Sequence, residues 1–204
     1  MLRFLKSHKL LLLIPLAFYL YNWVFENTAV FWYMYTFAIL VLMSLAIMFS
    51  KIFDEMATWK SVLFGLTFGA LIYGAIAIGF QLLAIFPIAD EKNVARFFSA
   101  FSPTSIWHFL LLMLIIVPGE EIFWRGFVQQ QLKQYAPTSL AILFSASLFG
   151  LALSLGEFVL GGFAGAFAGI VLGTLYEWKR SMPLIIIAHL VLIVLLFLVL
   201  PLPL

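Results

Sequence analysis

The chain consists of long apolar runs, and the short segments between them hold most of its charged and turn-forming residues. A helix that crosses the roughly 30 Å hydrocarbon core of a membrane needs about 20 apolar residues. On that basis the pattern predicts about seven membrane-spanning helices, and between six and eight, near Leu10–Val24, Val30–Phe49, Ser61–Phe86, Ser105–Pro118, Ser139–Leu155, Phe158–Tyr176 and Pro183–Leu200. The runs lack the period of two that the strands of a membrane barrel require. We therefore expect an all-α, polytopic membrane helix bundle.

The pattern does not by itself settle the structure of two of these runs. The fourth run is short for a span, but its pattern continues past Pro118 through Glu120–Lys133, either as one long kinked helix or as two joined helices. The first run follows basic residues, as in a signal peptide, but no small-residue cleavage site comes after it. We expect it to remain as the first helix, and residues 1–204 to form a single integral membrane domain.

Composition agrees with a membrane protein and excludes several other classes. Hydrophobic residues make up 65% of the chain and charged residues 10%, whereas soluble domains have about 25% charged residues. The chain has no cysteine, which excludes disulfides, iron–sulfur clusters and a cysteine nucleophile. Its net charge is +2 and its Lys and Arg residues are scattered, so we expect membrane lipids around it and no nucleic acid as a partner.

The distribution of Lys and Arg predicts the orientation of the bundle, because cytoplasmic loops carry an excess of these residues. With the N-terminus in the cytoplasm, the outer side receives only Lys92 and Arg96. The inner side receives Arg3, Lys6, Lys9, Lys51, Lys60, Lys133, Lys179 and Arg180. This bias predicts an integral plasma-membrane protein with a cytoplasmic N-terminus, and the lack of cysteine favours a prokaryotic membrane.

Small residues and one amphipathic segment complete the pattern. Glycines recur every four residues on one face of the sixth run and of the third: Gly161, Gly165, Gly169 and Gly173, and then Gly65 and Gly69. Such faces let helix backbones approach closely in lipid, within one bundle or across a dimer interface. The segment Asp90–Pro103 is polar and then rich in phenylalanine. We expect it to lie along the membrane surface, where it could also flank a path for substrate.

One group of charged residues lies within the apolar part of the pattern. Glu120, Glu121 and Arg125 follow the fourth run and precede more helix, and charges at such depth are costly and usually functional. Glu121 and Arg125 are four residues apart and share a helix face, so they can form a buried ion pair. Glu120 points about 100° away, lacks a partner nearby in the sequence and is free to act as an acid or base. The alternative is a cluster at the membrane surface that anchors the helix.

Histidines are the other candidates for chemistry. His189 lies about seven residues into the last predicted helix and has apolar neighbours throughout. A hydrogen-bonded packing residue and a functional residue both fit that position. His8 lies in the basic tail and His108 at the start of the fourth run, where we expect both to be interfacial.

At these residues the chain resembles the CAAX protease and bacteriocin-processing family of intramembrane proteases. Glu120-Glu121-Ile-Phe-Trp-Arg125 matches the family's Glu-Glu-x-x-x-Arg motif, and His189 matches the histidine of its last motif. The resemblance covers about residues 100–200. It implies hydrolysis of a membrane-associated peptide or protein, with Glu120 as the base that activates water and His189 as a group that positions the water or stabilises the oxyanion. It also implies that Glu121 and Arg125 hold the geometry of the helix.

Two positions depart from the family pattern. Leu153 stands where the second motif has a histidine, and Ile193 where the last motif has asparagine or aspartate. Neither side chain can bind a metal or donate a hydrogen bond. The family resemblance leaves open a divalent metal such as zinc, with Glu120 and His189 as its candidate ligands, and a site without metal. Glu157, four residues after Leu153, could supply a carboxylate if its helix continued that far.

Three functions are open on the sequence alone. The first is an active intramembrane endopeptidase, which Glu120 and His189 support. The second is a catalytically degenerate relative that acts as a membrane scaffold or binds a peptide or protein partner, which Leu153 and Ile193 support. The third is a small transporter or immunity-type membrane protein with a buried acid as a proton or ion site, which nothing specific in the sequence favours.

Overall fold

The apolar runs are helical in the computed structural model of the chain, which describes residues 9–85 and 91–201. The helices are α2 (Lys9–Glu26), α3 (Phe31–Phe49), α4 (Thr58–Ile85), α5 (Glu91–Phe101), a long run made of α6, α7 and α8, then α9 (Thr138–Ser154), α10 (Val159–Lys179) and α11 (Met182–Val194). A π-helical turn, Leu195–Val199, extends α11. Within the described ranges the only extended pairing is an isolated bridge between Asp54 and Ser181. The predicted all-α bundle is confirmed.

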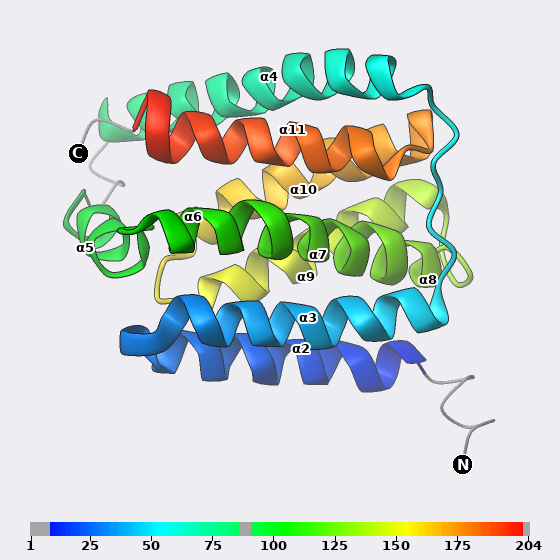
Figure 1. The fold of residues 1–204 in the computed structure, drawn as a ribbon, viewed down its shortest axis with the longest axis horizontal. Coiled ribbons are helices and arrows are strands. Elements are labelled where there is room, and N and C mark those ends of the chain that lie inside the picture. The colour runs from blue at the N-terminus through cyan, green and yellow to red at the C-terminus, as the bar shows by residue number, and fades with distance from the viewer. Residues whose placement is uncertain (1–8, 86–90, 202–204) are drawn as a thin grey trace.

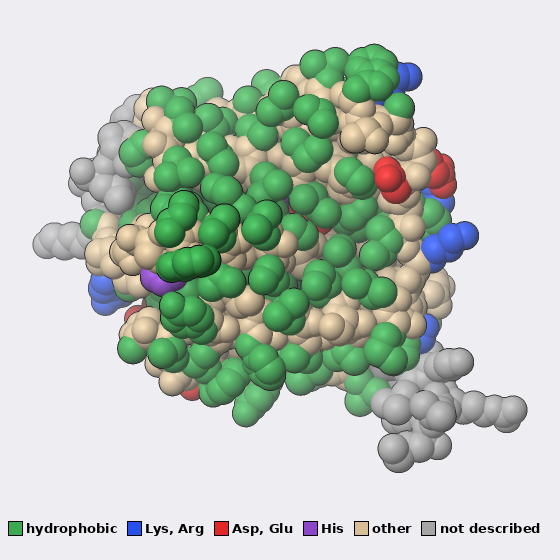
Figure 2. Space-filling view, in the orientation of Figure 1, with side chains coloured by type: hydrophobic (Ala, Val, Ile, Leu, Met, Phe, Trp, Pro, Cys, Tyr) green, Lys and Arg blue, Asp and Glu red, His purple; other side chains and the backbone are tan. Residues whose placement is uncertain are grey.

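The lengths of these helices fit a polytopic membrane protein. Six helical segments of the described chain are long and apolar enough to cross a membrane. The predicted span Ser139–Leu155 corresponds to α9, which is apolar but shorter, with 17 residues. Figure 2 shows one face of the bundle covered by hydrophobic side chains, with charged side chains near its two ends. Such a belt matches the hydrocarbon layer of a bilayer.

The fourth apolar run continues through Pro118 without a break. Its parts are α6 (Ile106–Leu111), α7 (Val117–Glu121) and α8 (Gln130–Leu132), and π-helical segments, Leu112–Ile116 and Ile122–Gln129, join them. Proline has no N–H to donate, and Pro118 is the second residue of α7, which begins directly after the first π-helical segment. Of the two predicted possibilities, a single helical run forms. Segments of π-helix frequently occur at functional sites.

This central run lies between pairs of helices. α2 and α3 form a hairpin on one side of it, and α4 packs along α11 on the opposite side (Figure 1). α9 and α10 pack against each other behind it, and the run itself contacts α3, α9, α10 and α11. Glu120, Glu121, Arg125 and Gln129 of the central run are therefore enclosed by protein.

The described basic residues gather at one end of the bundle, apart from Arg125 and Arg96. Lys9 begins α2, and its Nζ donates to the carbonyl oxygen of Phe49 at the end of α3, at 3.3 Å. The same end holds Lys51, Lys60, Lys133, Lys179 and Arg180, whereas Arg96 of α5 lies at the other end (Figures 1 and 2). Arg3, Lys6, His8 and the side chain of Lys92 lie outside the described residues. The grouping agrees with the predicted topology, and the side of the membrane stays a prediction.

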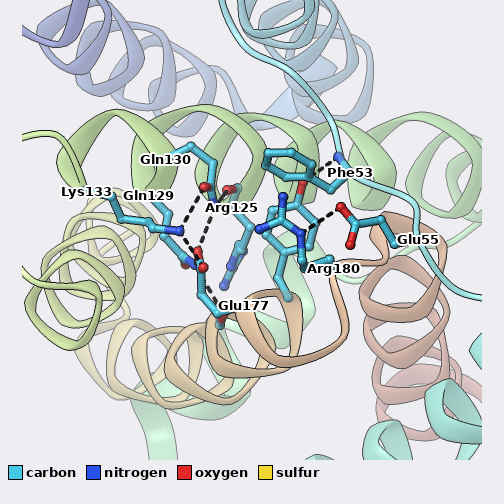
Figure 3. A network of polar contacts seen from close by, with 10 residues as sticks. Phe53, Glu55, Arg125, Gln129, Gln130, Lys133, Glu177 and Arg180 are labelled. Carbon is cyan, nitrogen blue, oxygen red and sulfur yellow. Dashed lines mark hydrogen bonds and ion pairs between the residues drawn. The ribbon is translucent and has the colours of Figure 1, made fainter.

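The connection between α3 and α4 crosses this basic end and is fixed to the corner between α10 and α11 (Figure 3). The backbone N–H of Phe53 donates to the hydroxyl of Tyr176 at 3.0 Å, and the N–H of Met182 donates to the carbonyl of Phe53 at 3.0 Å. Arg180 forms an ion pair with Glu55 at 2.8 Å. These contacts hold the α2–α3 hairpin and α4 to the rest of the bundle.

The predicted surface segment Asp90–Pro103 forms α5, which lies across the end opposite to the basic end (Figure 1). Its phenylalanines point into the bundle. Phe101 packs on Phe31 and Phe97 on Phe158, with ring centroids 4.7 Å and 4.5 Å apart. Arg96 has a side-chain exposure of 65%. The helix is therefore amphipathic, as predicted, and Asp90 lies outside the described residues.

The glycine faces serve packing within the bundle. A Cβ atom at Gly69 of α4 would lie 2.5 Å from the carbonyl oxygen of Ala188 and 2.6 Å from Cβ of Val191, both in α11. A Cβ atom at Gly165 of α10 would lie 2.5 Å from Cδ1 of Leu153 in α9. Close backbone contact is what holds helices together where lipid offers no hydrophobic drive for their association. Of the two predicted uses of these faces, packing within the bundle is the one that the structure shows.

Gly69→Ala should therefore destabilise the bundle, because the new methyl group meets the backbone of α11, which cannot move aside cheaply. We expect a loss of about 1–3 kcal/mol in the free energy of unfolding, measured by thermal unfolding in detergent. Gly74→Ala is the matched control in the same helix, since a Cβ atom there would meet nothing within 4 Å. Equal stability of the two variants would contradict this packing.

Candidate active site

The charged motif of the central run lies buried in the middle of the bundle. Glu120 is 5% exposed, Glu121 is fully buried and Arg125 is 1% exposed. Nη1 of Arg125 donates to Oε1 of Glu121 at 3.0 Å, so the predicted ion pair between residues four apart forms. This burial inside the bundle favours a functional cluster over one that anchors the helix at the membrane surface.

His189 of α11 also contacts the Glu121–Arg125 ion pair. Its Nδ1 lies 2.7 Å from Oε1 of Glu121, the same oxygen that accepts from Arg125. An ionised carboxylate only accepts hydrogen bonds, so Nδ1 carries the proton in this contact. In the neutral ring the lone pair is then on Nε2. The glutamate that orients His189 is therefore Glu121, and not the neighbouring Glu120.

Glu120 has partners from helices far away in the sequence. The hydroxyl of Tyr21 in α2 donates to Oε1 of Glu120 at 3.2 Å, and the hydroxyl of Tyr35 in α3 donates to the same oxygen. Nε1 of Trp124 donates in turn to the hydroxyl of Tyr21 at 3.3 Å. The prediction that Glu120 is unpartnered holds for its own helix only. Sequence reasoning missed both tyrosines, because nothing in their spacing links them to a motif about 100 residues later.

Glu120 and His189 both line one cavity of about 520 Å³. Tyr35 is a further polar residue of its wall, and Leu153 and Ile193 line it too. The remaining wall is almost entirely apolar and extends to the aromatic rings of α5. The structure therefore brings the two candidate catalytic residues and both altered positions to one space, and shows that Leu153 and Ile193 leave aliphatic surface there.

Glu157 does not extend this site. Helix α9 ends at Ser154, and the backbone of Glu157 has a φ of 57°, outside any helix. Its side chain is 84% exposed and lies 3.8 Å from Arg96. The expectation that Glu157 could replace a lost polar group is wrong, because the chain leaves the helix before the next turn.

The donor set at the cavity does not fit a catalytic metal. Catalytic zinc sites use three protein ligands and an open position. Within the described residues, no three His, Cys, Asp or Glu side chains form a group that could hold a metal ion. The candidate ligands Glu120 and His189 are two, and Oε1 of Glu121 already accepts from Arg125 and His189. The positions that could add a ligand hold Leu153 and Ile193.

Glycines of α10 make room for polar side chains of the central run. A Cβ atom at Gly169 would lie 2.9 Å from Nη2 of Arg125, and one at Gly173 would lie 2.5 Å from Oε1 of Gln129. These two atoms and Oε2 of Glu121 are buried without a hydrogen-bond partner among the described residues. Buried polar atoms of this kind are usually satisfied by ordered water.

A second polar cluster lies on the same face of the central run, at the basic end of the bundle (Figure 3). Glu177 of α10 lies 2.5 Å from Nζ of Lys133, and its Oε1 accepts from Nε2 of Gln129 at 2.9 Å and of Gln130 at 2.7 Å. Of these residues, only Lys133 had a predicted role, as one of the basic residues on the inner side. Their spacing was the available clue: Gln129 follows Arg125 by four residues, on the face that Glu121 begins.

His108 lies at the start of α6, near the end of the bundle that carries α5, and stacks on Trp32 at 5.5 Å between ring centroids. It does not line the cavity. The predicted interfacial position agrees with this placement.

The central run and the helices that follow it are similar to a known protein family. Residues 102–195 match the model of the Rce1-like family, described as type II CAAX prenyl endopeptidase Rce1-like. This segment is therefore similar to the Rce1-like family. This supports the fold of an intramembrane endopeptidase, and the Rce1-like segment contains Glu120, Glu121, Arg125 and His189. No curated protein and no solved structure matches the chain. The tyrosines that contact Glu120 lie outside the matched segment.

Glu121→Gln should destabilise the bundle strongly, because it leaves the buried Arg125 without its counter-charge. Removing one partner of a buried ion pair costs about 3–5 kcal/mol, measured by thermal unfolding. Glu55→Gln is the matched control, since its pair with Arg180 is exposed and such pairs contribute about 1 kcal/mol or less. A loss of stability at Glu121 no larger than that at Glu55 would show that the pair is not essential.

Proposed function

We propose that this chain is an intramembrane endopeptidase in which Glu120 activates the water that attacks the peptide bond. The single observation that carries this proposal is that Glu120 and His189, from different helices, line the same cavity. A carboxylate and an imidazole at one space are the groups that general acid–base hydrolysis uses. The altered positions and the short donor set argue against a metal, so no step depends on one.

Hydrolysis proceeds in two balanced steps at these residues. Glu120 accepts a proton from water while the water oxygen bonds to the carbonyl carbon of the substrate, and the carbonyl oxygen becomes an oxyanion. Protonated Glu120 then gives this proton to the leaving amine as the carbon–nitrogen bond breaks. Both hydrogen bonds from Tyr21 and Tyr35 reach Oε1, so Oε2 is the oxygen for this proton transfer. Nε2 of His189 can hold the water in place.

The substrate is a membrane-associated peptide or protein. The cavity wall is apolar apart from a few groups near Glu120, so it favours a chain with apolar side chains or an attached hydrocarbon. The name of the matched family, CAAX prenyl endopeptidase, points to lipid-modified peptides as the first probes. The grouped basic residues support a cytoplasmic N-terminus, and in our proposal the membrane is a prokaryotic plasma membrane.

A second function is favoured by Leu153 and Ile193. Both line the cavity, and neither can stabilise a developing charge. In this alternative the chain is a catalytically degenerate relative that holds a membrane peptide or protein in the cavity without cutting it. Glu121, Arg125 and His189 would then be structural, and Glu120 would anchor a polar group of the partner.

Glu120→Gln distinguishes these functions, because it preserves shape and hydrogen-bond acceptance by the side-chain oxygen but removes the base. We expect a loss of at least about 10²-fold in cleavage rate, measured with a farnesylated CAAX peptide and by profiling peptide termini in membranes from wild-type, deletion and Glu120→Gln cells. Glu157→Gln is the control, because this exposed carboxylate lies outside the cavity.

Cleavage products that disappear in both the deletion and the Glu120→Gln strain would establish the peptidase. Products that persist in Glu120→Gln, or a wild type without any product, would contradict it. Restoration of the deletion phenotype by folded Glu120→Gln protein would then support the non-catalytic function.

A further inference from the structure

Hydrolysis at this cavity needs a donor for the oxyanion, and the motif positions do not supply one. Leu153 and Ile193 present only carbon atoms to the cavity. A single donor aimed at an oxyanion contributes about 10²–10³ in rate, so an active enzyme needs a substitute. The substitute must line the cavity, carry an N–H or O–H group and lie beside Glu120, where the water is activated.

Tyr35 meets these three conditions. It lines the cavity, and its hydroxyl donates to Oε1 of Glu120. Nδ1 of His189 is already bound to Glu121, and its Nε2 has the separate role of holding the water. Trp32 also lines the cavity, but it lies three residues before Tyr35 and stacks on His108. No hydrogen bond joins Trp32 to Glu120 in the described part of the chain.

We propose that the hydroxyl of Tyr35 stabilises the oxyanion at this site, and that Tyr21 positions Tyr35 and Glu120 for that role. This inference rests on the proposed endopeptidase function. It assigns a catalytic residue to α3, which lies outside the segment 102–195 matched to the Rce1-like family. The α2–α3 hairpin is then part of the active site rather than an accessory to it.

The two tyrosines differ in what they can reach. Tyr21 is fully buried, is not part of the cavity wall and accepts from Nε1 of Trp124. Its own proton points to Glu120. Tyr35 is 6% exposed and lines the cavity. Tyr35 can therefore contact a substrate in the cavity, whereas Tyr21 cannot. Tyr21 is a positioning residue.

Aromatic packing fixes the ring of Tyr35. Its centroid lies 5.5 Å from that of Tyr21 in an edge-to-face contact and 5.4 Å from that of Phe31. A ring held in this way does not have to reorganise during the reaction, and donors that are already oriented stabilise a transition state best.

The hydrogen bond of Tyr35 can follow the charge during the first step. Before the reaction the negative charge is on Glu120, and Tyr35 donates to it. When Glu120 takes the proton of water, the charge appears on the carbonyl oxygen of the substrate. The Tyr35 O–H then turns from the neutral carboxyl group to the oxyanion and returns when the carbon–nitrogen bond breaks. No proton leaves Tyr35, so the balance of the reaction is unchanged.

Tyr35→Phe tests this role by removing one hydroxyl while the ring stays. With the farnesylated CAAX peptide in lipid vesicles, we expect kcat to fall by about 10²–10³-fold with KM nearly unchanged, because the donor acts on the transition state. Tyr21→Phe should reduce kcat by a smaller factor. Tyr33→Phe is the matched control, because Tyr33 is a neighbour on α3 with a 60% exposed side chain.

A second variant separates catalysis from folding. Ile193→Asn adds an amide donor to the cavity wall at the position where the family motif has a polar residue. In the Tyr35→Phe background, Ile193→Asn should raise kcat by at least about ten-fold. Equal thermal unfolding of the protein with and without Ile193→Asn would show that this recovery is not a repair of folding. Cleavage lost in Glu120→Gln but unchanged in Tyr35→Phe would overturn this inference alone. No cleavage by the wild type would overturn it together with the proposed function.

Discussion

The carboxylate of Glu121 organises the interior of this bundle. It is fully buried, and one of its oxygens accepts from Arg125 of its own helical run and from His189 of α11. A charge at this depth is tolerable only when it is paired, so the central run and α11 must keep their relative position. Gly169 allows the guanidinium of Arg125 to lie against α10, and the ring of Phe149 covers it at 4.7 Å. Three helices therefore depend on one carboxylate.

Adjacent glutamates have different environments because they point in different directions from one helix. Glu121 faces Arg125 and His189, whereas Glu120 faces the α2–α3 hairpin and accepts from two neutral hydroxyl groups. Neutral donors hold a carboxylate in place without cancelling its charge, which leaves it able to accept a proton. The same arrangement places Glu120 at the edge of an apolar cavity. Structural and chemical roles are thus divided between neighbouring residues.

The cavity combines an apolar wall with a small group of polar side chains, as ligand pockets commonly do. Its walls are suited to hydrocarbon, and its polar groups are confined to the region of Glu120, His189 and Tyr35. An apolar chain that enters is guided to this region because only there can its polar atoms find hydrogen-bond partners. Leu153 and Ile193 enlarge the apolar part at the expense of the polar part. The remaining donors therefore decide whether the site can catalyse or only bind.

Local sequence determined the positions of the helices and the Glu121–Arg125 pair, because these depend on apolar length and on a spacing of four residues. The family motif likewise identified Glu120, His189, Leu153 and Ile193, which share one cavity. Only the tertiary structure decided which polar groups meet. Tyr21 and Tyr35 contact Glu120 across 99 and 85 residues, and His189 contacts Glu121 across 68. Such contacts depend on how each helix is rotated about its axis. That rotation follows from the packing of glycines and aromatic rings between helices, which no pattern along a single helix contains.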